Sequence, residues 1–109
     1  MRSAVVALLL LAACRKEGPS PGAKLYASLA CATCHGETGA GGSLVLALAG
    51  KREHWTREKL VEYLKDPIGY AARDARLSAQ ARTYTLPMQR YDKAKPEELL
   101  AVADYVLSL

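Results

Sequence analysis

The feature that most constrains this chain is the pentapeptide Cys-Ala-Thr-Cys-His at residues 31–35. Residues three positions apart share one face of a helix, so the two thiols can reach the same flat partner while the imidazole stands beside it. This is the geometry of covalent haem attachment, in which each sulfur adds to a porphyrin vinyl group and the imidazole ligates the iron. The pattern therefore predicts a c-type haem site at Cys31, Cys34 and His35.

Two other kinds of site could use the same residues. A thioredoxin-like redox pair needs surrounding β-strands, and the chain has no alternating pattern that indicates them. A zinc site could draw on the pentapeptide together with His54. However, adjacent Cys34 and His35 fit a tetrahedral site poorly, and the usual C-x2-C…H-x3-H spacing is absent. Haem attachment is the favoured interpretation.

Length and composition agree with a buried cofactor. A chain of 109 residues suggests one small domain, near the size at which a core of side chains alone is barely sufficient. It has no Phe, six Tyr and one Trp, so few aromatic side chains are available to fill the interior. A haem would supply the missing apolar volume. The net charge of +4 is mild and the basic residues are scattered, which argues against nucleic-acid binding.

The N-terminal segment has the pattern of an export signal. Arg2 precedes an apolar run over residues 4–13, which has the length of a signal peptide's apolar region and is too short to span a bilayer comfortably. The run ends in LAAC at Cys14, which resembles a bacterial lipoprotein box. We therefore expect a signal peptide over residues 1–13, cleaved before a lipidated Cys14. An ordinary signal peptide or an uncleaved anchor is the alternative.

The segment after the signal divides the chain into a tether and a domain. Residues 14–21 contain the lipidated Cys and a flexible linker, because Gly and Pro break regular structure there and charged residues keep it solvated. The folded domain should then occupy residues 22–109. We expect it to lie outside the cytoplasmic membrane, anchored to the outer, periplasmic face.

The hydrophobic pattern predicts an all-α domain without strands. Residues 43–50 read as a core-lining loop or a short helix, and residues 84–91 as a loop. Thr56 is a suitable N-cap, and Pro96 suits the first position of the last helix. The helices are expected over residues 22–31, from Thr56 to Asp66, over residues 70–82, and from Pro96 to the C-terminal end.

A haem iron that carries electrons needs a second axial ligand. Met88 is the only Met beyond the expected signal, and it lies in a Pro-bounded loop distant in sequence from His35. His54 is the only other His, and we expect it at the surface or at a helix start. A thioether is a soft, neutral ligand that favours ferrous iron and raises the reduction potential. We therefore predict axial ligation by His35 and Met88, which leaves no open site for a substrate and indicates an electron carrier, not an enzyme.

These features resemble the small monohaem class I cytochromes c of bacteria over residues 22–109. The resemblance rests on the pattern Gly22…Leu25-Tyr26 before the pentapeptide, on the Met88 loop, and on the ending Tyr105-Val106-Leu107. It implies a cytochrome c fold, with three to five helices wrapped around one covalently attached haem. It also implies that the N- and C-terminal helices cross and pack together, with Gly22 and Leu25-Tyr26 near the Tyr105 region. It also implies thioether bonds at Cys31 and Cys34, with His35 and Met88 as the iron ligands.

The same resemblance suggests further contacts of the haem. In the family a Tyr or Trp often contacts a haem propionate, and Trp55 is our candidate, although it could instead form a hydrophobic staple with Leu60. Many relatives have a Pro after the glycine loop whose carbonyl accepts a hydrogen bond from the proximal His. Residues 43–45 contain no Pro, so the carbonyl that orients His35 is left open.

The function implied is that of a one-electron carrier in a respiratory or related electron-transport chain. Its partners would be redox proteins, with a donor like quinol–cytochrome c reductase and an oxidase or reductase as acceptor. Lys51, Arg90 and Lys93 are candidates to meet an acidic partner. The alternatives are a haem c subunit of a membrane-associated oxidoreductase complex and, less in keeping with Met88, a haem sensor or enzyme with an open distal site.

Overall fold

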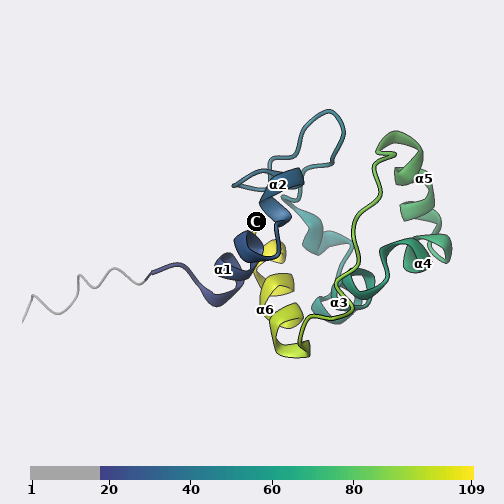
Figure 1. Ribbon diagram of the computed structural model, residues 1–109. Coiled ribbons are helices and arrows are strands. Elements are labelled where there is room, and N and C mark those ends of the chain that lie inside the picture. The colour runs from purple at the N-terminus through teal and green to yellow at the C-terminus, as the bar shows by residue number, and fades with distance from the viewer. Residues whose placement is uncertain (1–17) are drawn as a thin grey trace, which may run out of the picture.

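The computed structural model describes residues 18–109. The expected signal peptide and the expected lipidation site, Cys14, lie outside the described residues. The elements in chain order are α1 (Pro21–Ser28), α2 (Cys31–His35), the 3-10 helix η2 (Lys51–Glu53), α3 (Arg57–Lys65), α4 (Pro67–Ala72), α5 (Ala75–Thr83) and α6 (Pro96–Leu107) (Figure 1). No strand occurs between residues 18 and 109, so the all-α prediction is confirmed. The described part of the chain, residues 18–109, forms six α-helices, more than the three to five that we expected.

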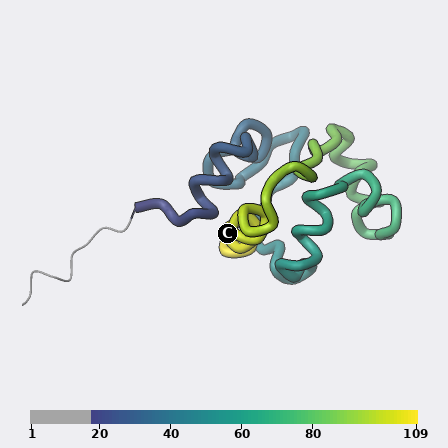
Figure 2. The backbone as a smooth tube through the Cα atoms, turned by 60° about the horizontal axis from the view of Figure 1, so that its bottom comes forward, coloured from purple at the N-terminus to yellow at the C-terminus, as the bar shows by residue number. Residues whose placement is uncertain are grey.

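The first and last helices pack against each other, as Figures 1 and 2 both show. Gly22 lies so close to α6 that a Cβ atom there would overlap the carbonyl oxygen of Ala101. One turn later, the rings of Tyr26 and Tyr105 are in contact, with centroids 5.3 Å apart. The expected meeting of the terminal helices near Gly22 and Tyr105 is therefore confirmed.

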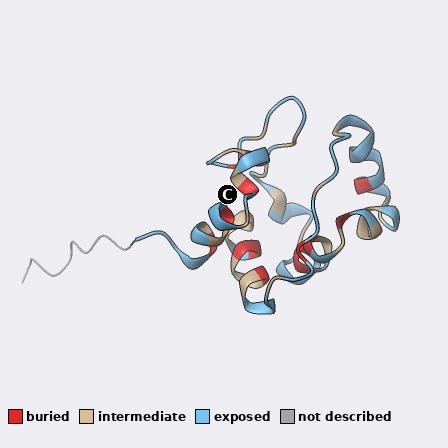
Figure 3. Cartoon of the chain, viewed as in Figure 1, coloured by how far each residue is buried: buried red, intermediate tan, exposed pale blue. Residues whose placement is uncertain are grey.

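Helix α3 completes the main core. Its buried face consists of Leu60, Val61 and Leu64, which belong to the same cluster as the buried residues of α6. The predicted N-cap is confirmed, because the Thr56 hydroxyl accepts a hydrogen bond from the Lys59 backbone at 3.2 Å. Figure 3 shows the buried residues gathered mainly where α1, α3 and α6 meet. None of the described helices has the length and apolar character needed to cross a membrane.

Two segments break where one helix was expected. In the first, α1 ends at Ser28 and Ala30 adopts a left-handed conformation with φ of 62°, so the pentapeptide forms its own short helix. In the second, the carboxylate of Asp74 accepts a hydrogen bond from the Leu77 backbone at 3.0 Å and starts α5. Such local side-chain caps compete with helix continuation, which is why residues 70–82 divide between α4 and α5.

Two long loops connect these helices. Residues 43–50 form a loop without regular structure, in agreement with the first of our two expectations for this segment. Residues 84–95 run from the end of α5 to the start of α6. On the way they pass between α4 and α5 on one side and α2 and α3 on the other (Figure 1). This second loop carries Met88, so its path decides where the Met88 thioether lies.

Candidate haem site

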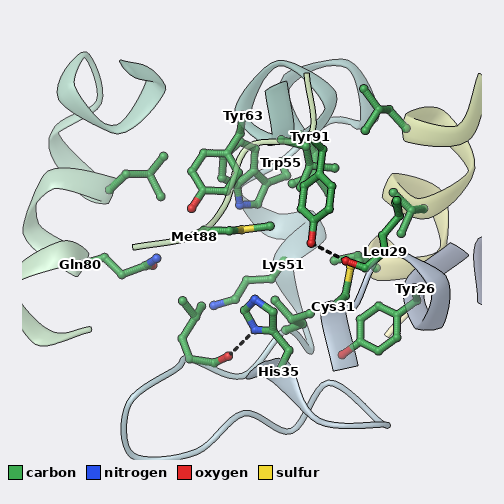
Figure 4. A pocket seen from close by; sticks show the side chains of 18 residues that line it. Tyr26, Leu29, Cys31, His35, Lys51, Trp55, Tyr63, Gln80, Met88 and Tyr91 are labelled. Carbon is green, nitrogen blue, oxygen red and sulfur yellow. Dashed lines mark hydrogen bonds between the residues drawn. The ribbon is translucent and has the colours of Figure 1, made fainter. Parts of the chain in front are cut away.

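A cavity of about 490 Å³ lies between α2, the 43–50 loop, α4, α5 and the 84–91 segment. This volume falls within the range of small-molecule and cofactor sites. A narrower space of about 70 Å³ leads from it toward α3 and α6, and the two share His35, Leu77 and Met88 among their lining residues. Leu, Val, Ala and aromatic side chains make up most of the walls, so the site suits a large apolar group (Figure 4).

Helix α2 places both thiols of the pentapeptide on the cavity wall. Cys31 is buried and Cys34 is exposed, and the two are not joined in a disulfide. Burial raises the pKa of the Cys31 thiol, while a hydrogen bond with the Tyr91 hydroxyl opposes that shift. The three-residue spacing thus gives one thiol inside the cavity and one at its edge, both on the same helix.

His35 is oriented by a backbone carbonyl. Its Nδ1 lies 3.2 Å from the carbonyl oxygen of Leu46 (Figure 4), which is the partner that the sequence left open. A carbonyl can only accept, so Nδ1 carries the proton and Nε2 keeps its lone pair. Burial lowers the pKa of the imidazole and the Leu46 carbonyl partly offsets this, so the neutral form is favoured. A neutral imidazole with a free Nε2 is the form that binds a metal.

Met88 is half-buried and points into the same cavity from the 84–91 segment. In Figure 4 it lies on the side of the cavity facing His35. His54 is exposed and is not among the residues that line either space. Across residues 18–109, no three His, Cys, Asp or Glu side chains are grouped closely enough to hold a metal ion, so the zinc alternative finds no support.

Trp55 also lines the narrow part of the cavity. Its ring packs on Tyr63 and Tyr70, with centroid distances of 5.2 and 5.5 Å, and the Arg76 guanidinium lies 5.4 Å from its centroid. Trp55 directly precedes Thr56, the N-cap of α3, and packs against the core cluster that contains Leu60. Trp55 and Leu60 therefore stand at the two positions of a hydrophobic staple. The propionate contact of Trp55 stays a prediction.

The family model for cytochrome c matches residues 19–109. The chain belongs to the cytochrome c family. Its cofactor is therefore covalent haem c, and its general role is haem-based electron transfer. Neither a curated protein nor a solved structure shows significant similarity to it.

The cavity of this cytochrome c domain fits the cofactor of its family. Apolar walls match the porphyrin face, and a thiol pair on one helix matches the two attachment points. A single cationic side chain, Lys51, reaches into the cavity beside His35 (Figure 4), where it can meet the carboxylates of the haem. We had considered Lys51 for docking a partner, but the structure directs its side chain inward.

Tyr91 is the residue of this site that the sequence did not reveal. It is 8% exposed, lines the cavity, and donates a hydrogen bond from its hydroxyl to the Leu29 carbonyl at 2.7 Å. Burial raises the pKa of its phenol, and the neighbouring Cys31 thiol adds to the shift. The two hydrogen-bonded residues are 62 positions apart, so no local pattern could have indicated the contact.

Proposed function

We propose that this cytochrome c is a one-electron carrier whose haem is attached through Cys31 and Cys34 and ligated by His35 and Met88. The observation that supports this most strongly is that all four side chains line one apolar cavity. Three come from α2 and the fourth from a loop more than 50 residues away in the chain. Bound there, haem c supplies an iron that accepts and returns one electron.

The chain's contribution on the proximal side is to present a fixed, neutral imidazole. The Leu46 carbonyl holds the proton on Nδ1 and fixes the ring orientation. Burial disfavours the imidazolium, which would have no lone pair for the iron. His35 would therefore hold the haem iron through Nε2 as a neutral ligand in a fixed orientation.

On the distal side the chain supplies a thioether and excludes water. Met88 is a neutral ligand that favours the ferrous state, and the surrounding Leu and Tyr side chains keep the site apolar. An apolar site disfavours the additional positive charge of the ferric state, so both effects raise the reduction potential. If His35 and Met88 both hold the iron, no position would be open for a substrate, so the protein would act as a carrier and not as an enzyme or gas sensor.

The charged and aromatic groups of the narrow end support the orientation of the cofactor. Lys51 and Trp55 come from one turn, since the Trp55 backbone donates to the Lys51 carbonyl at 3.1 Å, and both line the cavity. We assign this end to the haem propionates, with Lys51 as the cation that meets them and Trp55 as a second donor. The haem edge that is bonded to the exposed Cys34 would then lie at the open mouth of the cavity.

The mouth of the cavity supports brief docking of a redox partner. Leu44, Ile68 and Leu86 line it while being 66%, 66% and 53% exposed. An apolar rim around a buried redox group allows close approach without a large, permanent interface. The partners we propose are a donor like quinol–cytochrome c reductase and an oxidase or reductase acceptor in a respiratory chain. Permanent residence in an oxidoreductase complex is the alternative.

We further propose that the protein is exported and held on the periplasmic face of the cytoplasmic membrane by lipid on Cys14. The apolar run before Cys14 in the sequence supports this. A Cys14→Ser variant made in a bacterium should then carry haem normally but appear in the soluble periplasmic fraction. Retention of that variant in the membrane fraction would argue for an uncleaved anchor.

The haem assignment is tested by counting the thioether bonds. Denatured protein treated with pyridine should give the spectrum of a haem with no remaining vinyl group. Cys31→Ala and Cys34→Ala should each give the spectrum of a haem with one vinyl group, and the double variant should lose haem on denaturation. Cys14→Ser is the matched control and should keep the wild-type spectrum. Loss of covalent haem in Cys14→Ser alone would contradict the assignment.

A further inference from the structure

We propose that Tyr91 is a positioning residue that holds the Met88 loop at the depth needed for iron ligation. The proposal rests on the proposed role of Met88 as axial ligand. Tyr91 is not itself an iron ligand. Its effect is exerted through the three-residue link to Met88.

The backbone near Met88 has few attachments of its own. Among the described residues, the backbone of 85–89 forms no hydrogen bond with the rest of the chain. On the N-terminal side the nearest attachment is the Tyr84 amide, which donates to the Gln80 carbonyl at the end of α5. On the C-terminal side, the Arg90 side chain makes two exposed contacts, a hydrogen bond of 3.5 Å to the Lys65 carbonyl and an ion pair of 3.7 Å with Asp92. The Met88 loop therefore depends on whatever fixes its C-terminal end.

Tyr91 fixes that end from two directions. Its backbone amide donates to the Leu64 carbonyl in α3 at 2.8 Å, and its hydroxyl donates to the Leu29 carbonyl at 2.7 Å (Figure 4). The Tyr91 side chain is only 8% exposed, so water cannot readily replace its hydroxyl as the donor to the Leu29 carbonyl. Loss of this hydrogen bond should therefore cost free energy. The two bonds span from α3 to the segment after α1.

The Leu29 end of this bond links the loop to the haem attachment segment. Leu29 precedes Ala30, whose left-handed φ of 62° turns the chain into α2, and Cys31 follows directly. One hydroxyl thus joins the segment that delivers the thiols to the loop that delivers the thioether. Loosening it should free Met88 to leave the iron more often while the covalent attachment persists.

The test measures how fast an added ligand replaces Met88 on the ferric holoprotein. Cyanide or imidazole can bind only when the Met88–iron bond is open, so the rate reports loop opening. Tyr91→Phe keeps the ring and the Leu64 bond and removes only the hydroxyl. A hydrogen bond contributes about 1 kcal/mol, so we expect about a five-fold faster rate.

Tyr26→Phe is the matched comparator. Tyr26 is 3% exposed and its hydroxyl donates to the Gly36 carbonyl at 2.6 Å, beside His35 and away from the Met88 loop. Both variants should lose similar stability in urea, but only Tyr91→Phe should accelerate cyanide binding. Equal rates in Tyr91→Phe and wild type, or equal acceleration in both variants, would overturn the positioning role.

Met88→Ala separates this proposal from the proposed function. If Met88 is the ligand, Met88→Ala binds cyanide much faster than wild type, whatever Tyr91 does. If Met88→Ala and wild type bind cyanide equally fast, the proposed axial ligation itself fails. If Met88→Ala is fast while Tyr91→Phe equals wild type, only the positioning role fails.

Discussion

Replacing Gly22 with alanine should weaken the contact between α1 and α6 that closes the domain. The added Cβ would lie 2.7 Å from the Cβ of Tyr105 and 3.1 Å from the carbonyl carbon of Ala101, and closer still to the Ala101 oxygen. None of these atoms can move aside by a change of rotamer, because each is part of the α6 backbone or bonded directly to it. The two helices must therefore separate.

The expected loss follows from two opposing effects. Overpacking of a close contact costs about 1–3 kcal/mol. Alanine is the better helix former by up to about 1 kcal/mol, but Gly22 is the second residue of α1, where this gain is reduced. We expect a net loss of about 1–2 kcal/mol. For a domain of this size, that corresponds to a fall in melting temperature of about 5–15 °C.

The assay is urea and thermal unfolding of the ferric holoprotein, followed by far-ultraviolet circular dichroism. Gly42→Ala is the control, because a Cβ at that position would meet nothing within 4 Å and should change stability by less than about 0.5 kcal/mol. A Gly22→Ala protein as stable as Gly42→Ala would refute the close approach of the two helices at this point.

Three other predictions concern the site and its surroundings. Ala30→Gly should raise the free energy of unfolding in urea by about 0.5–1 kcal/mol, because glycine removes left-handed strain but gains freedom in the unfolded chain. Burial raises the pKa of Tyr26, Tyr63 and Tyr91, so the unfolded chain releases their protons first and stability in urea should fall as the pH rises above about 10. Lys51→Met should lower the reduction potential by about 20–40 mV in redox titrations, while Lys51→Arg keeps it, since a half-buried ion pair contributes about 0.5–1 kcal/mol.

The parts of the fold that sequence reasoning predicted are those set by local chemistry. Thr56 caps α3 and Pro96 begins α6, as expected, because cap and first-turn preferences depend on neighbouring residues alone. The contact at Gly22 was implied by family resemblance and is also present. The cap and the helix start need no knowledge of the tertiary structure, whereas the α1–α6 contact at Gly22 was supplied by the resemblance alone.

The parts that the sequence did not reveal depend on contacts between distant segments. Residues 22–31 contain good helix formers, yet Ala30 leaves the helix, and the adjacent Leu29 carbonyl is held by Tyr91 from the other end of the domain. The carbonyl that orients His35 belongs to Leu46, and only the path of the 43–50 loop determines which carbonyl that is. Backbone acceptors carry no side-chain signature, so they cannot be identified from residue types.

The measurement that tests the central claim most directly compares wild type with Met88→Ala. Ferric wild-type protein should show the weak far-red charge-transfer band of a sulfur–iron bond, and the untreated ferrous form should not bind carbon monoxide rapidly. In Met88→Ala the band should vanish and carbon monoxide should bind readily. Persistence of the band in Met88→Ala, or rapid carbon monoxide binding by the wild type, would contradict ligation of the haem iron by His35 and Met88.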